Sequence, residues 1–224
     1  VKISDALKAY NDQAESDAMD SESGNATNLP VIRYEEGQSM TAIWAVRSLG
    51  IDPATGQEIF LKKDGVTTTY DYDTDDKAVV GDSNPKYHGN FGFNGEYKGF
   101  GASCSFSYRF GGDYYNQTLV NRVENVDIAY NVDRRVLNNT WNTIGDIATF
   151  KKIGTTATTT YPTSRFVEKN NELRFASFSC YYDFKYMSWL KKSKVERLKL
   201  SFYMNDIFRV STVKTERGTD YPYA

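Results

Sequence analysis

The sequence is poor in the side chains that carry most enzyme chemistry. Its 224 residues include two cysteines, Cys104 and Cys180, and one histidine, His88. Zinc sites usually combine several Cys and His ligands at short spacing, which excludes a zinc enzyme or a zinc finger. A Ser-His-Asp triad would have to use His88, and no GxSxG turn accompanies it. We therefore expect a protein that is not an enzyme, with no catalytic residue and no cofactor.

Long apolar runs and an excess of one charge are missing too. No run approaches the roughly 20 apolar residues of a transmembrane helix. The 27 Lys and Arg are balanced by 29 Asp and Glu, which argues against a nucleic-acid partner, because such a surface needs clustered basic side chains. A membrane β-barrel stays possible, since its strands alternate and are polar on average. The chain begins at Val1 without a secretion-signal segment, which predicts a mature, processed or partial chain.

Aromatic side chains are abundant, with 17 Tyr, 13 Phe and 3 Trp, and many of them alternate with small or polar residues. From Phe100 to Phe110 every second residue is aromatic, Ala or Cys, and the residues between are Gly, Ser or Arg. The run Tyr87–Tyr97 alternates in the same way, and only Lys98 and Gly99 separate the two. A period of two predicts β-strands, and a two-residue link predicts a hairpin.

Two more alternating runs, Glu172–Phe184 and Glu196–Asn205, follow near the end of the chain, joined by a Lys-rich link. The four runs have about 10 to 11 residues, the length that crosses a bilayer with tilt, whereas soluble strands average about 5 to 6. Aromatic residues lie at the ends of the apolar faces, and the links alternate between short and long. All three features are typical of an outer-membrane β-barrel, with short periplasmic turns and long extracellular loops.

The rest of the chain is less regular. Ser39–Arg47 is an apolar run that predicts a further strand, and Val1–Tyr10 fits either a short helix or the end of a strand. The acidic stretch from residue 11 to residue 28 and the stretch 62–84 are expected to be polar connections. Residues 111–170 are expected to form a long irregular loop.

Several stretches of the sequence occur together and in a recognisable order. They are Glu36–Ser39, Ser48–Gly65 (SLGIDPATGQEIFLKKDG), Val79–Phe91, Glu96–Leu119, Arg122–Leu137, Thr163–Phe184 and Ser211–Ala224. In these stretches the chain resembles the C-terminal barrel region of SusC/RagA-family TonB-linked outer-membrane proteins. The resemblance covers most of the chain after residue 36.

The resemblance implies a barrel of about 22 strands closed around an N-terminal plug, in the outer membrane of a Gram-negative, Bacteroidetes-like cell. It implies a nutrient importer and receptor with a SusD-like surface lipoprotein as lid, TonB as energy source, and oligosaccharides or sometimes peptides as substrate. The expected fold is all-β, with about five to six antiparallel transmembrane strands in contact with outer-membrane lipid. Residues 1–30 would be a polar connection after a preceding strand, and 31–224 the C-terminal barrel part, without the plug and the final strand.

The long loop contains a candidate substrate site. Tyr114, Tyr115 and Trp141 are aromatic residues near amides such as Asn116. Aromatic faces stack on the C–H faces of sugars and amides bond hydroxyl groups, a combination that suits a neutral glycan. The alternative is a loop that packs on itself and on a lid protein.

Charged residues give two weaker hypotheses. Asp71, Asp73 and Asp75 have the spacing of an EF-hand, but Asp76 and Asp82 occupy positions where the calcium loop has Gly and Glu. A solvated acidic loop is the alternative to a calcium site. A second, mixed-charge set is expected to form a salt-bridged loop core; it comprises Arg122, Glu124, Asp133, Arg134 and Arg135.

Two other classes of protein stay open at this stage. One is a soluble or surface-attached β-sandwich that binds carbohydrate, and the other is an adhesin or structural surface protein. A sandwich would bury Phe106 and Phe202 in a common core, whereas a membrane barrel would expose them to lipid.

Overall fold

A computed structural model describes residues 3–19, 29–125, 133–153, 160–192 and 195–213. The described chain divides into two compact units. Of the described residues, the mixed unit holds those up to Asn84 together with Asp113–Glu168, and the long-strand unit holds Pro85–Gly112 and those from Lys169 to Val213. None of the helices in the described ranges is long and apolar enough to cross a membrane.

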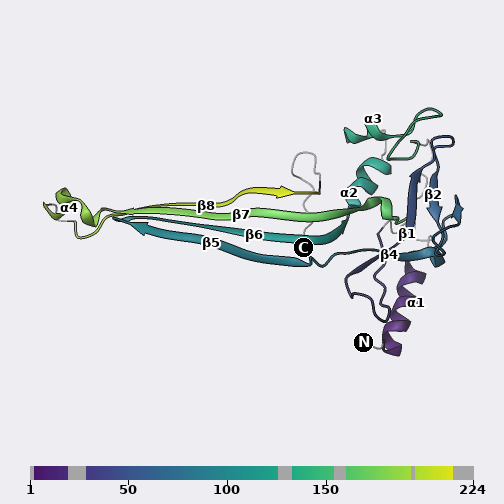
Figure 1. Cartoon of the computed structure of the whole chain (residues 1–224), viewed down its shortest axis with the longest axis horizontal. Helices are drawn as coiled ribbons and strands as arrows, with labels where there is room; N and C mark the ends of the chain where they lie inside the picture. The colour runs from purple at the N-terminus through teal and green to yellow at the C-terminus, as the bar shows by residue number, and fades with distance from the viewer. Residues whose placement is uncertain (1–2, 20–28, 126–132, 154–159, 193–194, 214–224) are drawn as a thin grey trace. The chain divides into compact units, whose positions relative to one another are not determined.

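The long-strand unit is a four-stranded sheet (Figure 1). Its strands, in the order in which they lie side by side, are β5 (Tyr87–Tyr97), β6 (Phe100–Tyr115), β7 (Val167–Asp183) and β8 (Lys199–Ser211). β5 and β6 pair antiparallel without a break, and Lys98 (φ 46°) and Gly99 (φ 87°) form the turn between them. Two positive φ values suit a tight type I′ hairpin. The predicted strands and their two-residue turn are confirmed.

The strands are longer than the alternation predicted. β6 continues past Phe110 to Tyr115, and β7 already begins at Val167, so the predicted loop 111–170 shrinks to the residues between them. The alternation in the sequence stops at Gly111, yet the backbone pairing does not. Gly111 adopts a positive φ of 79° and donates its N–H to Asn171 Oδ1 at 2.8 Å, which keeps the two strands together.

One face of this sheet is apolar and exposed. An aromatic ring from each strand forms a row, with centroid distances of 5.1 Å for Phe91–Phe106, 4.5 Å for Phe106–Phe175 and 5.6 Å for Phe175–Phe208. Phe202 of β8, which lies opposite Cys180 on the same face, is 52% exposed. Of the buried hydrophobic side chains in the described ranges, only two belong to this unit. The face is therefore not the core of a β-sandwich.

The opposite face is polar. Ser103 Oγ and Ser179 Oγ lie 2.8 Å apart across β6 and β7, and the Tyr181 hydroxyl donates to Glu96 at 2.7 Å. Ser105 is opposite Gly92 in the β5–β6 register, whereas Cys104 is opposite Phe93. The two faces predicted from the alternation are therefore present for β5 and β6.

The two cysteines lie on the neighbouring strands β6 and β7. The contact of Ser103 with Ser179 sets position 104 opposite position 178, so Cys180 lies one diagonal step from Cys104. Diagonal Cα atoms are roughly 7–8 Å apart, and disulfides rarely exceed about 6.8 Å. Both thiols are free in the structure. We expect thiol alkylation under non-reducing conditions to label both cysteines, as read by mass; an unlabelled protein two hydrogens lighter would overturn this register.

The mixed unit is built on a second four-stranded sheet. Its strands lie in the order β3 (Thr68–Thr69), β2 (Glu58–Leu61), β1 (Ala42–Ile51) and β4 (Lys77–Asp82). Short helical segments surround it, namely α1 (Asp5–Met19), η2 (Thr74–Asp76), α2 (Gln117–Leu119), the π-helical η3 (Val120–Glu124), α3 (Arg135–Asn139) and η4 (Ser164–Phe166). Completely buried side chains such as Val46, Val120 and Phe166 form the interior.

Three expectations for this unit need correction. The predicted strand Ser39–Arg47 is β1, which begins and ends later, and the predicted polar loop 62–84 contains β3, η2 and β4. The polar connection expected within residues 1–30 is the helix α1 as far as Met19, and residues 20–28 lie outside the described ranges. Polar side chains hold this helix in place, because Asn11 bonds both the N–H and the carbonyl of Tyr34 and Glu15 pairs with Lys77 at 2.6 Å.

Candidate functional site

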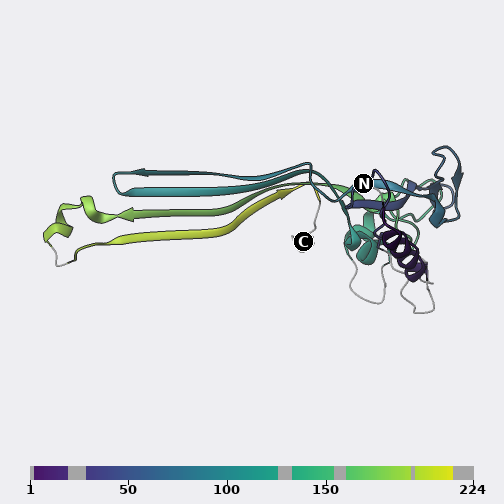
Figure 2. The same cartoon turned by 90° about the horizontal axis from the view of Figure 1, so that it is seen from below.

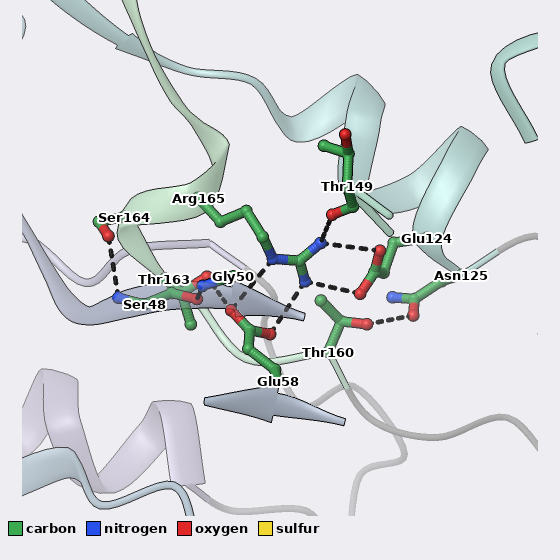
Figure 3. A network of polar contacts seen from close by, with 10 residues as sticks. All are labelled: Ser48, Gly50, Glu58, Glu124, Asn125, Thr149, Thr160, Thr163, Ser164 and Arg165. Carbon is green, nitrogen blue, oxygen red and sulfur yellow. Dashed lines mark hydrogen bonds and ion pairs between the residues drawn. The ribbon is translucent and has the colours of Figure 1, made fainter. Parts of the chain in front are cut away.

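A buried ion-pair cluster lies inside the mixed unit (Figure 3). Arg165 in η4 pairs with Glu58 at the start of β2 at 2.9 Å and with Glu124 at the end of η3 at 2.6 Å. The three side chains, which we call the Arg165 cluster, are 7%, 6% and 0% exposed, in that order. Charged side chains are almost never so deeply buried unless they are paired.

All three nitrogens of the Arg165 guanidinium are in use. Nε donates to Glu58 Oε1 at 3.1 Å, and Nη1 donates to Glu124 Oε2 at 3.1 Å and to the Thr149 carbonyl at 2.7 Å. Nη2 donates to both carboxylates. Thr163 adds a hydroxyl donor to Glu58 Oε1 at 2.8 Å. Such paired contacts on a rigid planar group fix geometry as well as charge.

The electrostatics of the cluster keep Arg165 charged. Burial alone would lower the pKa of Arg165, but the hydrogen bonds and charges of Glu124 and Glu58 outweigh it and raise the pKa overall. Two carboxylates face one guanidinium, and Lys151 supplies further positive charge. Burial lowers the pKa of Lys151, and the negative charges of Glu124 and Glu58 oppose that shift.

The cluster joins segments that are distant in the sequence. Glu58 and Arg165 are separated by 107 positions and Glu124 and Arg165 by 41. Next to the cluster, Ser164 Oγ accepts the Ser48 N–H at 3.0 Å, and the Thr160 hydroxyl donates to Asn125 at 2.5 Å (Figure 3). The carboxylates are saturated by donors, so the arrangement suits a clamp that holds loops in place rather than acid–base chemistry.

The predicted substrate residues do not form one exposed patch. Tyr115 is buried against Phe166, and Asn116 is buried while its side chain caps α2 by accepting the Leu119 N–H. Trp141 is buried elsewhere, with Nε1 donating to the Pro53 carbonyl at 3.0 Å. Tyr114 is half-buried. Burial of three of the four matches the alternative of a loop that packs on itself, and their role in substrate binding stays a prediction.

The turn at Pro53 explains part of the GIDPATG stretch. Gly56 has a φ of 73°, and a Cβ atom there would lie 2.7 Å from the ring of Trp141. Asp52 closes the turn by accepting hydrogen bonds from the Ala54 N–H and the Thr55 hydroxyl. Position 56 therefore requires glycine for two reasons: the backbone has a positive φ, and the Trp141 ring leaves no room for a Cβ atom.

The acidic stretch is a capped turn in the structure. Asp71, Asp73 and Asp75 are exposed, and Asp73 accepts the N–H of Asp75 at 3.0 Å as the cap of η2. Within the described ranges no group of three His, Cys, Asp or Glu side chains gathers as a metal site would require. The Asp76 side chain instead accepts a hydrogen bond from the Lys63 N–H at 2.9 Å. The calcium hypothesis gains no support from this geometry.

The mixed-charge set is divided between two places. Glu124 belongs to the Arg165 cluster, and Asp133 pairs with Arg135 at 2.7 Å. The expectation that these residues make internal salt bridges is thus confirmed for Glu124, Asp133 and Arg135. Arg165, which pairs with Glu124, was not in the predicted set.

An aromatic stack was also missed. Tyr72 and Tyr161 stack with centroids 4.1 Å apart and planes 7° apart, and Phe60 meets the edge of Tyr72. Burial raises the pKa of Tyr72, with further contributions from the charges of Glu15 and Glu58. Tyr161 is 42% exposed and offers a ring at the surface. No periodicity connects these residues in the sequence, so only the fold brings them together.

Comparison with known proteins finds solved structures with a similar fold. No protein-family model matches the sequence, and no curated protein matches it. A solved structure described as the RagAB peptide transporter has a TM-score of 0.61 and 18% identity over 76% of this chain. The RagAB peptide importer in its open-open state has a TM-score of 0.63 and 19% identity over 80% of this chain. In its closed-closed state the TM-score is 0.61, with 19% identity over 75% of this chain. This chain spans 19% of each of those chains, so it corresponds to about a fifth of their length.

Proposed function

We propose that this chain is part of a TonB-dependent outer-membrane importer of the SusC/RagA family. The observation that carries the proposal is the exposed aromatic face of the long-strand unit, whose four strands alternate between apolar and polar residues. Exposed apolar patches of this extent on a soluble domain are rare, whereas lipid covers such a face in a membrane barrel. The likeness of the fold to RagAB chains supports the same assignment.

In this proposal the long-strand unit spans the membrane and the mixed unit lies outside the cell. The β5–β6 turn has two residues, and the chain enters and leaves the mixed unit at the opposite strand ends. Outer-membrane barrels have short periplasmic turns and long extracellular loops. Residues 31–224 are then the C-terminal part of the barrel, and residues 1–30 connect it to a preceding strand. The strand edges at β5 and β8 would pair with other strands of the same barrel.

The partners and the substrate follow from the same proposal. A SusD-like lipoprotein would cover the extracellular side, and TonB would act through a region outside this sequence. The substrate class is a nutrient oligomer, either an oligosaccharide or a peptide. The Tyr161 ring, 42% exposed and stacked on Tyr72, offers one aromatic surface for contact with a substrate or a lid. Tyr114, Tyr115, Asn116 and Trp141 would support such a contact from inside the loops.

Uptake experiments test the proposed activity. Cells with the complete protein should accumulate fluorescently labelled oligosaccharides or peptides, and a protonophore should abolish the accumulation because TonB transmits the proton-motive force. Comparison of the two labelled pools would identify the substrate class. Equal uptake by cells that lack the protein would contradict the proposal.

Proteolysis tests the orientation. A protease added to intact cells should first cut the described surface loops of the mixed unit, such as the exposed segment around Ile144 and Ile147. The Lys98-Gly99 turn should resist until the outer membrane is disrupted, although a lysine there offers a cleavage site. Cleavage after Lys98 in intact cells would reverse the proposed orientation.

A further inference from the structure

The four long strands lie side by side in one layer, so their polar side chains share one face (Figures 1 and 2). One end of this face carries the β5–β6 turn and the link from β7 to β8, which contains η5 (Phe184–Tyr186) and α4 (Ser188–Lys192). Near this end polar side chains bond to one another across the strands, as the Tyr181 hydroxyl does with Glu96. The hydrogen-bonding capacity of these side chains is therefore partly used within the sheet itself.

A polar patch on β5 and β6, further from that turn, lacks such contacts. Arg109 is directly opposite His88, and Ser107 is directly opposite Asn90, so the four side chains share the polar face. Arg109, His88 and Asn90 are exposed, and Ser107 is half-buried. Within the described ranges none of these four side chains has a hydrogen bond or an ion pair. We call the four residues the Arg109 patch.

The Arg109 patch lies beside one part of β7. β6 meets β7 on both sides of Arg109, because the Phe106 ring contacts Phe175 and the Gly111 N–H bonds Asn171. Arg109 therefore neighbours the part of β7 between these two contacts.

The charges on that part of β7 and on its partner strand β8 are already balanced. Arg174 pairs with Asp206, and Glu172 pairs with Arg209 at 3.5 Å. Arg174 and Arg209 are directly opposite each other, and like charges in that position are destabilising. The two carboxylates balance these two guanidiniums, whereas Arg109 is a third guanidinium that has no carboxylate partner in the described part of the chain.

The chemistry of the Arg109 patch suits a carboxylate. A guanidinium presents parallel N–H donors that match the two oxygens of a carboxylate, and such bidentate pairs are stronger than neutral hydrogen bonds. The Ser107 hydroxyl and the Asn90 amide both donate and accept, so they can bond hydroxyl or amide groups next to that carboxylate.

We propose that the Arg109 patch binds a carboxylate of an acidic nutrient oligomer inside the barrel. The inference rests on the proposed function, in which the polar face of the long-strand unit lines the barrel interior. The carboxylate is the chemistry shared by two sources, oligosaccharides of uronic acids and peptides rich in Asp or Glu. Arg109 is the group that selects for charge, and the neutral side chains of the patch support the neighbouring part of the oligomer.

Calorimetric titration of the complete protein in detergent tests the inference. The acidic probes are hexagalacturonate and hexaglutamate, and their uncharged counterparts are the methyl ester of hexagalacturonate and hexaglutamine. At least one acidic probe should bind about tenfold more tightly than its uncharged counterpart, because hydrogen bonds to charged groups are the stronger ones. The probe that shows this preference identifies the source of the carboxylate.

Variants of Arg109 show whether the preference arises at the patch. Arg109→Gln should abolish the preference for the acidic probe, and Arg109→Lys should keep part of it, since lysine retains the charge without the planar pair of donors. The matched control Arg134→Gln removes an exposed arginine of the mixed unit and should keep the whole preference. The melting temperature of Arg109→Gln should equal that of the unmodified protein.

The outcomes separate the inference from the proposed function. Equal affinity for acidic and uncharged probes, or an equal loss in Arg109→Gln and Arg134→Gln, would overturn carboxylate binding and leave import untouched. A clearly lower melting temperature of Arg109→Gln would show that Arg109 holds another part of the barrel, and would also overturn the inference. Cells that accumulate neither oligosaccharides nor peptides would contradict import itself.

Discussion

Replacement of Arg165 by methionine should lower the free energy of unfolding of the mixed unit by about 3–5 kcal/mol, because it leaves two buried carboxylates without their cation. Glu58 and Glu124 are almost fully buried, and each accepts at least two hydrogen bonds from Arg165. Denaturation can be followed by the fluorescence of Trp44 and Trp141, which are both buried in this unit, after Trp189→Phe removes the third signal.

A control and a rescue sharpen this experiment. Lys8 pairs with Asp5 at 3.3 Å on the exposed side of α1, so Lys8→Met should change the stability by less than about 1 kcal/mol. Conversion of Glu58 and Glu124 to glutamine in the Arg165→Met background should recover part of the loss, since neutral amides are less costly to bury without a cation. If Arg165→Met behaves like Lys8→Met, the cluster does not clamp the unit.

Cys104→Arg should destabilise the membrane-inserted protein by roughly 2–4 kcal/mol, and Ser105→Arg should have a much smaller effect. Cys104 is opposite Phe93 on the aromatic face, where an arginine would have to enter the hydrocarbon region. Ser105 is opposite Gly92 on the face that also carries Ser103 and its hydrogen bond to Ser179. There an arginine would reach polar groups and, in the proposed barrel, the water in its interior.

Urea unfolding in lipid vesicles would compare the two arginine variants. The neighbouring positions share the same strand, so the difference between them reports the face of the sheet rather than the depth along it. Equal destabilisation by the two substitutions would mean that the aromatic face does not contact lipid.

The sequence was sufficient to predict most of the long-strand unit, because strands have a period of two and a tight turn has a distinct residue choice. The β5–β6 hairpin follows residue by residue from alternation and from Lys98-Gly99. Alternation is less informative near Asp206, which has a φ of 54° where the β7–β8 register shifts. The shift places Phe175 in ring contact with Phe106, a contact that no regular pattern predicts.

The mixed unit was much less predictable. Its helix α1 is rich in polar residues, its strand β4 is only six residues long, and their partners lie tens of positions away. Arg165 and Glu58 look like ordinary surface charges in the sequence, and only the folded structure shows that both are buried in one ion pair. Trp141 was predicted to bind substrate because aromatic and amide residues surround it, but its indole is occupied by the turn at Gly56.

The central claim is that the aromatic face of the long-strand unit contacts lipid. The direct measurement is fluorescence quenching by brominated lipids in a background with Cys104→Ser and Cys180→Ser. A bimane label is attached to a single cysteine, either Phe202→Cys on the aromatic face or Ser201→Cys on the polar face. The account predicts strong quenching at position 202 and little at position 201. Equal quenching at both positions, or none at position 202, would contradict it.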